Sequence, residues 1–320
     1  MKKLNGLTAT FLIGVGAILL GFSSCKNTAP KKTIKAEAPA YKISLAQWSI
    51  NKMIREDKVS PYEFASIASN WGFEGLEYVS QLYTDVTKSD DPEAAIKIFI
   101  QKNNELSAKF GLKNILIMVD EEGNLATQNE EERLIAIENH KKWINAAAAM
   151  GCHSIRINLF DETDPELWKS YSKLSLIALS EYALPLNVNI IVENHGYLSS
   201  NAALLMALMN EVNMKNCGTL PDFGNFCLKR ENNELWDAPC IESYDNYKGV
   251  AEMMPKAFAV SAKSYDFDGD GNETTLDYQR LISIVKSSGY DQYIGIEYEG
   301  SRLSEEEGIL ATRDLLLKLM

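Results

Sequence analysis

The 320-residue chain carries 44 acidic and 32 basic side chains, which gives a formal net charge of −12. Such a charge argues against nucleic acid as a partner, because binding to a phosphate backbone depends on Lys and Arg side chains that neutralise it. About 280 residues follow position 40, and a stretch of this length suits one large α/β domain better than two small ones.

The N-terminal residues have the layout of an export signal. Two lysines at positions 2 and 3 precede an apolar run over 7–22, which ends at Ser23, Ser24 and Cys25. A positive start, an apolar stretch and small residues are typical of a signal peptide, and the cysteine resembles that of a bacterial lipoprotein. We expect residues 1–24 to be a signal peptide, Cys25 to be lipidated, and the protein to be lipid-anchored in the periplasm or at the cell surface. A transmembrane anchor is the alternative, although the run is shorter than a usual span.

Residues 25–40 are polar, rich in Lys, Ala and Pro, and without periodicity, which is typical of a flexible tether. The folded domain is therefore expected over 41–320. In it, glycines at positions 72, 111, 151, 218 and 289 each follow an amphipathic stretch and precede an apolar run. Glycine after a helix often caps it in the left-handed conformation, so the pattern predicts a repeating unit of helix, glycine and strand.

The apolar runs predict eight strands with helices between them, for example over 92–110 and 129–150. The strands are expected over 42–50, 73–80, 112–119, 153–160, 188–193, 219–223, 257–263 and 292–298. Alternating strands and helices favour parallel pairing, and eight such units predict a (β/α)8 TIM barrel whose site lies at the carboxyl ends of the strands. An open doubly wound sheet is the alternative, but the segment SINKMIRED after the first strand lacks the Gly-rich phosphate loop expected of it.

Polar side chains stand at these predicted strand ends. In IRINLF, Arg156 and Asn158 share one face of a strand, and in VENHG, Glu193 and His195 do the same, because side chains alternate along a strand. The full set is Gln47, Trp48, Glu77, Asp120, Arg156, Asn158, Glu193, His195, Asp222, Asn225, Ser261, Lys263, Tyr265, Glu297 and Glu299. His140 and His153 are expected outside this site.

Several of these segments, taken in order along the chain, resemble the xylose isomerase-like barrel family of sugar isomerases and epimerases. The segments are GFEGLE, VENHG, PDFGN, VSAKSYDF and GIEYEG. The resemblance implies a metal site with ligands from strands five to eight, which here are Glu193, Asp222, Ser261 and Glu297. Ser261 stands where the family usually has a histidine, and Asn225 stands where a substrate-binding histidine is common.

The resemblance also implies the chemistry. Three carboxylates can still hold Mg²⁺ or Mn²⁺, which prefer oxygen ligands, and His195 is a candidate for the missing nitrogen. Glu193 or Glu297 would move a proton next to a carbonyl, and Lys263, with a lowered pKa, would donate to the developing oxyanion. The expected substrate-binding residues are Trp48, Glu77, Arg156, Asn158, His195 and Asn225.

Export favours a free or oxidised sugar over a sugar phosphate as the small-molecule substrate. The expected reaction is isomerisation, epimerisation, or hydration or elimination of a keto-sugar. The alternative is a carbohydrate-binding lipoprotein that retains the barrel without catalysis. A metal-dependent endonuclease of the same barrel would need more than three histidines and a basic groove, and the sequence leaves the oligomeric state open.

Two further features stay open. Cys227 and Cys240 bracket a polar insertion that a disulfide could close, whereas Cys152 and Cys217 are expected to be buried thiols. The segment 266–277, DFDGDGNETTLD, has the acidic spacing of a calcium loop. Its other positions depart from that pattern, so we prefer to interpret it as a polar loop over the barrel mouth.

Overall fold

Eight parallel strands make up one sheet in the computed structural model, which describes residues 41–320. The strand order is β6-β5-β4-β3-β2-β1-β10-β9, and single parallel bridges from Thr219 to Ala257 and from Asp222 to Ser261 join β6 to β9. The sheet therefore closes into the predicted barrel. Its strands are β1 (Lys42–Ala46), β2 (Gly75–Val79), β3 (Lys113–Met118), β4 (Ser154–Ile157), β5 (Asn189–Glu193), β6 (Cys217–Leu220), β9 (Val260–Ser264) and β10 (Tyr293–Tyr298).

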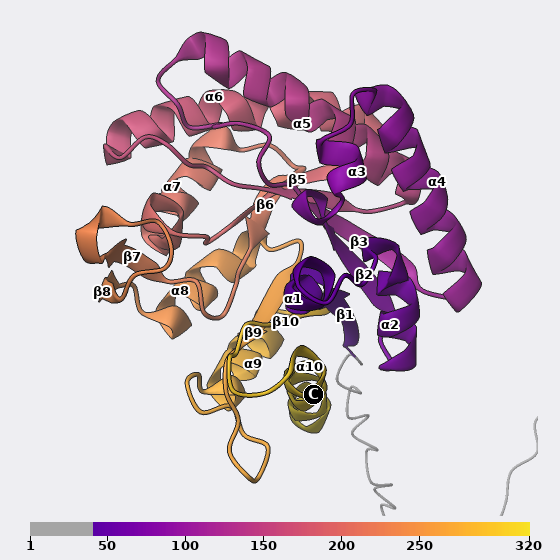
Figure 1. Ribbon diagram of the computed structural model, residues 1–320. Helices are drawn as coiled ribbons and strands as arrows, with labels where there is room; N and C mark the ends of the chain where they lie inside the picture. The colour runs from indigo at the N-terminus through magenta and orange to yellow at the C-terminus, as the bar shows by residue number, and fades with distance from the viewer. Residues whose placement is uncertain (1–40) are drawn as a thin grey trace, which may run out of the picture. The chain divides into compact units, whose positions relative to one another are not determined.

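The chain has helices around this sheet that cover its outer face, and a short one, α1, that lies over the end of the barrel (Figure 1). They are α1 (Asn51–Arg55), α2 (Phe64–Asn70), α3 (Thr84–Thr87), α4 (Pro92–Phe110), α5 (Glu130–Met150), α6 (Pro165–Ala183), α7 (Ala202–Val212), α8 (Asn246–Met253), α9 (Tyr278–Ser287) and α10 (Glu305–Leu319). The predicted (β/α)8 fold is thus confirmed, with α4 and α5 close to their predicted bounds. The expectations for residues 1–40, including the lipidation of Cys25, lie outside the described residues.

Caps explain where the long helices begin and end. The Asp91 side chain accepts from the backbone N–H of Ala94 at the start of α4, and Gly111 ends this helix with φ +69°. Gly151 ends α5 in the same way, with φ +72°. Gly218 does not cap a helix, contrary to the sequence pattern: it lies inside β6, where a side chain would meet the Lys256 carbonyl oxygen.

The first strand is shorter than predicted. It ends at Ala46, and Gln47–Ile50 form a 3₁₀ turn. The buried Gln47 amide accounts for the turn, because it donates to the carbonyl of Pro61 and accepts from the backbone N–H of Val79. The chain therefore leaves the sheet here, and Trp48 lies on a turn at the barrel mouth instead of on a strand.

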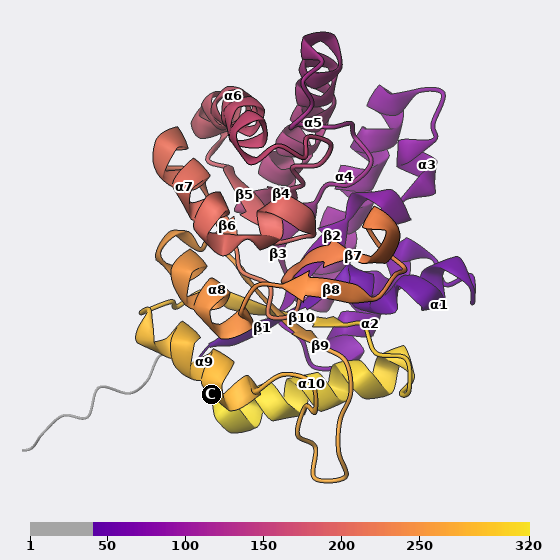
Figure 2. The same cartoon turned by 90° about the vertical axis from the view of Figure 1, so that its left-hand side faces the viewer.

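A hairpin between β6 and α8 lies outside the barrel sheet. Its strands β7 (Cys227–Arg230) and β8 (Cys240–Ser243) pair antiparallel, and Figures 1 and 2 show it beside α8. Cys227 and Cys240 form a disulfide with Cα atoms 5.8 Å apart, which confirms the pairing considered from the sequence. Cys152 and Cys217 are buried free thiols, as expected.

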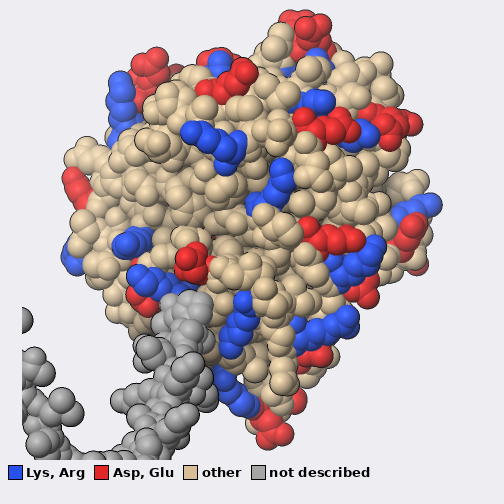
Figure 3. Space-filling model, turned by 180° about the vertical axis from the view of Figure 1, so that it is seen from behind, with Lys and Arg blue, Asp and Glu red and all other residues tan. Residues whose placement is uncertain are grey.

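The surface carries mixed charges. On the face seen from behind in Figure 3, Lys and Arg side chains are interspersed with Asp and Glu side chains. Within residues 41–320, no helix combines the length and hydropathy that crossing a membrane requires.

Candidate active site

Three carboxylates meet at the carboxyl ends of the strands. Glu193 is the last residue of β5, Asp222 follows β6 by two residues, and Glu297 belongs to β10. All three are buried, and one oxygen from each lies within 4.8 Å of the others. Among residues 41–320 this is the one such group of acidic, His or Cys side chains. The structure therefore brings together the three metal ligands expected from the sequence, which we call the acidic cluster.

Backbone groups hold Asp222 in place. Its Oδ1 accepts from the backbone N–H groups of Gly224 and Asn225, both at 2.8 Å. The buried Asn194 side chain accepts from the backbone N–H of Asp222 at 2.7 Å and donates to its carbonyl at 3.0 Å. Sequence reasoning gave Asn194 no such role, although it follows Glu193 directly and strand alternation turns its side chain away from that of Glu193.

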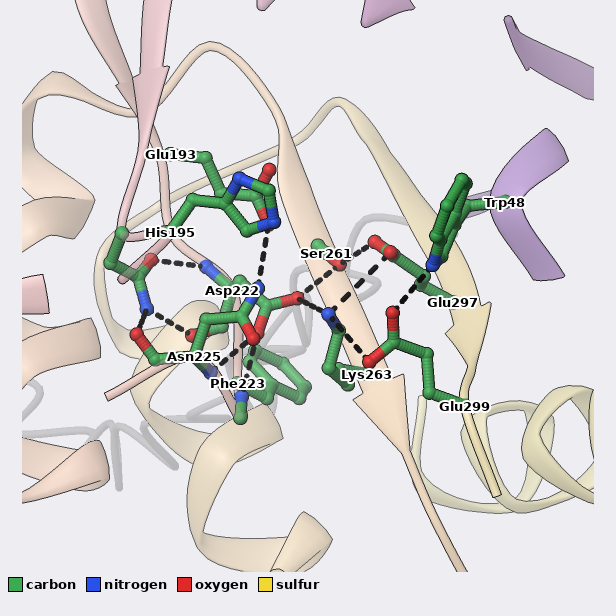
Figure 4. A network of polar contacts seen from close by, with 12 residues as sticks. Trp48, Glu193, His195, Asp222, Phe223, Asn225, Ser261, Lys263, Glu297 and Glu299 are labelled. Carbon is green, nitrogen blue, oxygen red and sulfur yellow. Dashed lines mark hydrogen bonds and ion pairs between the residues drawn. The ribbon is translucent and has the colours of Figure 1, made fainter. Parts of the chain in front are cut away.

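Ser261, which replaces the usual histidine, ties two members of the acidic cluster together (Figure 4). Its hydroxyl donates to Asp222 Oδ2 at 2.6 Å, and the same Oγ lies 3.1 Å from Glu297 Oε2. At the position where the resemblance implies a histidine ligand, this chain thus has a hydroxyl that contacts two carboxylates.

Lys263 is one of two cations among the carboxylates at this end of the barrel, and we call this group of charged residues the floor of the site. Its Nζ lies 3.2 Å from Glu299 Oε2 and 3.5 Å from Glu297 Oε1, and the side chain is 1% exposed. Burial alone would lower the pKa of the Lys263 ammonium, but attraction to Asp222, Glu297 and Glu299 holds it well above its ordinary value. A lowered pKa was expected beside a bound cation; among the protein groups alone, the carboxylates keep Lys263 protonated.

Arg156 connects the acidic cluster to the neighbouring strands. Its Nη1 donates to Asp120 Oδ1 at 2.7 Å, and its Nε lies 3.0 Å from Glu193 Oε2. The other oxygen of Glu193 accepts from the Asn225 amide at 3.0 Å. One oxygen of Glu193 thus accepts a hydrogen bond from Asn225, and the other forms an ion pair with Arg156 in which Nε makes no hydrogen bond.

His195 ends a chain of polar contacts that starts at Glu193 and passes through Arg156, Asp120 and Asn158. Asn158 donates to Asp120 through Nδ2 at 2.6 Å, so its Oδ1, 2.8 Å from His195 Nδ1, accepts the imidazole proton. Burial and the nearby Arg156 lower the pKa of His195 to about 3, so the ring is neutral. His195 does not belong to the convergent acidic group, and the idea that it supplies the missing nitrogen ligand is not supported.

The charges of the floor are unbalanced. Five carboxylates (Asp120, Glu193, Asp222, Glu297 and Glu299) face two cations, Arg156 and Lys263, which leaves an excess of three negative charges when all are ionised. Burial raises the pKa of Glu297 to about 8, and the neighbouring Glu193 and Glu299 add to the shift against the opposing effect of Lys263. A divalent cation would offset this charge. Because the donors are carboxylate oxygens, the residues fit Mg²⁺ or Mn²⁺.

A cavity of about 750 Å³ is lined by five residues of this floor, namely Asp120, Arg156, Lys263, Glu297 and Glu299, whereas Glu193 and Asp222 lie outside its lining. Trp48 lines one side; its Nε1 donates to Glu299 Oε1 at 2.7 Å, and the Arg55 guanidinium lies 4.6 Å from its ring centroid. His140 also lines the cavity, although the sequence placed it outside the site. The expected substrate-binding residues in the lining are Trp48, Arg156, Asn158, His195 and Asn225.

Sequence reasoning missed two aromatic residues of the cavity lining, Phe160 and Trp236. With His195 they form an aromatic group that we call the hairpin wall, since Trp236 comes from the loop between β7 and β8. The indole centroid is 4.7 Å from that of His195 and 6.1 Å from that of Phe160. The two cysteines that bracket this insertion were the signal available in the sequence, but they do not indicate over which part of the barrel the loop folds.

Glu77 is not part of the cavity lining. It is buried in the barrel, where Ser44 donates to its Oε1 at 2.5 Å, and Gly295 leaves the space that its carboxylate occupies. Burial raises the pKa of Glu77 to about 7. The structure thus separates Glu77 from the residues with which it was expected to bind substrate.

In the acidic loop 266–277, carboxylates contact other groups of the protein. Asp268 accepts from the backbone N–H groups of Asp270 and Asn272, and Asp266 pairs with Arg302. None of these side chains belongs to the convergent group found within the described residues. This arrangement agrees with a polar loop and gives no support to a calcium site.

Comparisons with known proteins agree with the barrel fold described above. A family model described as xylose isomerase-like TIM barrel matches residues 65–319. The 3-keto-D-glucoside 4-epimerase of E. coli has a similar structure, with a TM-score of 0.66 and 15% identity over 87% of this chain and 99% of that one. A xylose isomerase-like TIM barrel protein from Mycobacterium smegmatis, in complex with magnesium, has a TM-score of 0.60 and 16% identity over 88% of this chain and 97% of that one. At these identities the likeness shows the fold alone.

One curated relative matches over a short segment. The C-glycoside deglycosidase alpha subunit of Arthrobacter globiformis is 37% identical over 54 residues, which cover 17% of this chain and 15% of that protein. The match therefore spans about a seventh of the relative's length.

Proposed function

The chain belongs to the xylose isomerase-like TIM barrel family, and from this premise we propose that it is a metal-assisted enzyme acting on a free or oxidised sugar. The proposed step is removal of a proton from the carbon beside a carbonyl. It leads to isomerisation, epimerisation, or hydration or elimination of a keto-sugar. The observation that carries this proposal is the acidic cluster, of which Glu297 lines, together with Lys263, a cavity large enough for a sugar.

Glu193 and Glu297 are the proposed proton carriers. They reach the cluster from β5 and β10, so a sugar carbon between them could lose its proton to one carboxylate and regain a proton from the other. The hydrogen bond from Asn225 and the ion pair with Arg156 both restrain Glu193, which helps to keep that carboxylate directed for transfer.

Lys263 is the proposed donor to the oxygen on which negative charge develops. Its ammonium already lies among carboxylates that keep it protonated, and a preorganised donor of this kind stabilises an enolate without rearranging. A divalent cation held by Glu193, Asp222 and Glu297 would polarise the carbonyl and a neighbouring hydroxyl when bound.

The substrate class rests on two further considerations. We retain the proposal that the protein is an exported lipoprotein, and such a protein meets free sugars more than sugar phosphates. Relatives named for a 3-keto-D-glucoside and a C-glycoside support a keto-glycoside over an aldose. On this basis a 3-keto-glycoside is the first substrate to test.

The test is hydrogen exchange in D₂O. Purified protein is incubated with 3-ketoglucose and with a 3-keto-disaccharide, and deuterium at the carbon beside the carbonyl is followed by NMR. Glu193→Gln should lower the exchange rate by at least about 100-fold, the lower range for loss of a general base. Glu138→Gln is the matched control, because Glu138 is an exposed residue of α5 that pairs with Lys141. Full activity in Glu193→Gln would contradict the proposed site.

One observation favours a second candidate, a carbohydrate-binding protein without catalysis. Ser261 offers a hydroxyl where the family resemblance implies a histidine ligand, and this hydroxyl is already bonded to Asp222. Sugar binding by calorimetry without deuterium exchange under any metal condition would favour this candidate over the enzyme.

A further inference from the structure

The hairpin wall includes Trp236, whose indole N–H has no acceptor among the described residues and whose ring is partly exposed in the cavity lining. The chain has five tryptophans, and the other four donate their indole N–H to a protein acceptor: Trp48 to Glu299, Trp71 to Glu306, Trp143 to Glu122 and Trp168 to the Leu159 carbonyl. Among the described residues Trp236 has no such acceptor, and it is 36% exposed. Large aromatic side chains with an unused donor are typical of binding surfaces, since buried indole N–H groups usually find a partner.

The position of Trp236 is fixed by several contacts. The Cys227–Cys240 disulfide closes the hairpin, and the Arg230 side chain donates to the carbonyl of Ala238 at 2.8 Å. The Tyr197 hydroxyl, which follows β5, donates to the carbonyl of Asn233. The loop that bears the indole is therefore attached both to its own strands and to the barrel.

The barrel is shaped to accept the indole. Gly196 adopts φ +88°, and a Cβ at this position would lie 3.3 Å from the Trp236 ring and from the Leu235 side chain. A larger residue at 196 would push the ring away from His195, with which it packs at 4.7 Å between centroids. The VENHG segment thus supplies a carboxylate to the acidic cluster and, three residues later, the space for the hairpin wall.

Trp236 is separated from the acidic cluster by a defined path. The chain of polar contacts runs from Glu193 through Arg156, Asp120 and Asn158 to His195, and Trp236 packs against the imidazole. Glu297 and Lys263 line the same cavity as Trp236, so a sugar that reaches these two residues could carry a second group to the indole. The cavity of about 750 Å³ lies in the upper part of the range for ligand pockets, roughly 300–1,000 Å³, and exceeds what a single hexose needs.

We propose that Trp236, held by the disulfide-closed hairpin, forms a second subsite that binds the group attached to the reacting sugar, so that the preferred ligand is a glycoside with a second ring instead of a monosaccharide. The indole face would cover the C–H face of that ring, and its N–H would donate to a hydroxyl. Arg230 and Asp237, which also line the cavity, add charged hydrogen-bonding groups beside it. This inference deepens the proposed function and rests on it for the position of the reacting ring.

The test compares two ligands by isothermal titration calorimetry: 3-ketoglucose, and a disaccharide whose non-reducing ring is 3-ketoglucose. In the wild type the disaccharide should bind more tightly. Trp236→Ala should lower the affinity for the disaccharide about tenfold relative to that for the monosaccharide, and Trp236→Phe should lose less because it keeps an aromatic face. Leu317→Ala is the control, since Leu317 is an exposed apolar residue of α10, and it should leave both affinities as in the wild type.

The outcomes separate the subsite from the proposed function. An equal loss for both ligands, no loss for the disaccharide, or no preference of the wild type for the disaccharide overturns the subsite. Absence of deuterium exchange in the wild type, with the selective loss in Trp236→Ala intact, overturns the proposed chemistry and leaves the subsite standing. The thermal midpoint of Trp236→Ala should match that of the wild type, because the side chain is partly exposed and lies outside the barrel core.

Discussion

The acidic cluster, through Glu297, and the hairpin wall contribute to one cavity but are built in different ways. The cluster consists of residues at or near the ends of β5, β6 and β10, fixed by hydrogen bonds to neighbouring strands. The hairpin wall depends on an insertion between β6 and α8 that is closed by a disulfide. The difference suggests that the barrel positions the reacting groups, while the insertion selects what is attached to the reacting sugar.

Removing Lys263, one of the two cations of the floor, should have the largest effect on stability. Lys263→Met leaves Asp222, Glu297 and Glu299 without their ammonium partner, and breaking a buried charge pair in this way costs about 3–5 kcal/mol. Denaturant unfolding measures the loss. Lys97→Met, on the exposed side of α4, should change stability by less than about 0.5 kcal/mol. If both variants have the same free energy of unfolding, the stability of the barrel does not depend on the charge of Lys263.

Glu77 should make the free energy of unfolding of the barrel depend on pH. Its pKa is raised by burial from 4.5 to about 7 in the folded protein, so the folded state binds the proton more tightly than the unfolded state. Its stabilising contribution is complete below pH 4.5 and is lost as the pH rises to about 7, a change on the order of 3 kcal/mol.

Glu77→Gln tests this directly, because glutamine cannot titrate. The free energy of unfolding of the variant, relative to that of the wild type, should increase between pH 4.5 and pH 8. A difference that is the same at both pH values would show that Glu77 has a similar pKa in the folded and unfolded chain.

Opening the hairpin should have the smallest effect on the barrel. In Cys227→Ser with Cys240→Ser, the free energy of unfolding should fall by less than about 1 kcal/mol, since a segment outside the barrel sheet can open by itself. Limited proteolysis should then cut within 228–239, where the wild type resists. A loss of about 2–5 kcal/mol, the usual range for a disulfide that supports a whole small domain, would mean that the hairpin and the barrel unfold as one unit.

The same contrast explains what the sequence could predict. Glu193, Asp222 and Glu297 were predictable because parallel strands end at one edge of the barrel, so residues far apart in sequence must meet there. Trp236 was not, since nothing in a polar insertion indicates over which part of the barrel it folds. Local packing also decided the end of β1 at Ala46 and the burial of Glu77, through partners such as Pro61 and Ser44 that no periodicity indicates.

The direction in which the pKa of Lys263 is shifted is also a property that the sequence could not predict. Burial and neighbouring carboxylates shift it in opposite directions, and the sequence does not reveal how many carboxylates approach the ammonium. Three do, at 3.2–3.9 Å, and they outweigh the effect of burial. The sign of such a shift therefore follows from distances that only the folded chain supplies.

The central claim is that the acidic cluster abstracts a proton beside a sugar carbonyl with the help of a divalent cation. The most direct measurement is deuterium exchange into a 3-keto-glycoside by the wild-type protein after treatment with a chelator, followed by addition of Mg²⁺ or Mn²⁺. We predict that exchange stops after chelation and returns with the added ion. Exchange that continues unchanged in metal-free protein, or that never occurs with either ion, would contradict the claim.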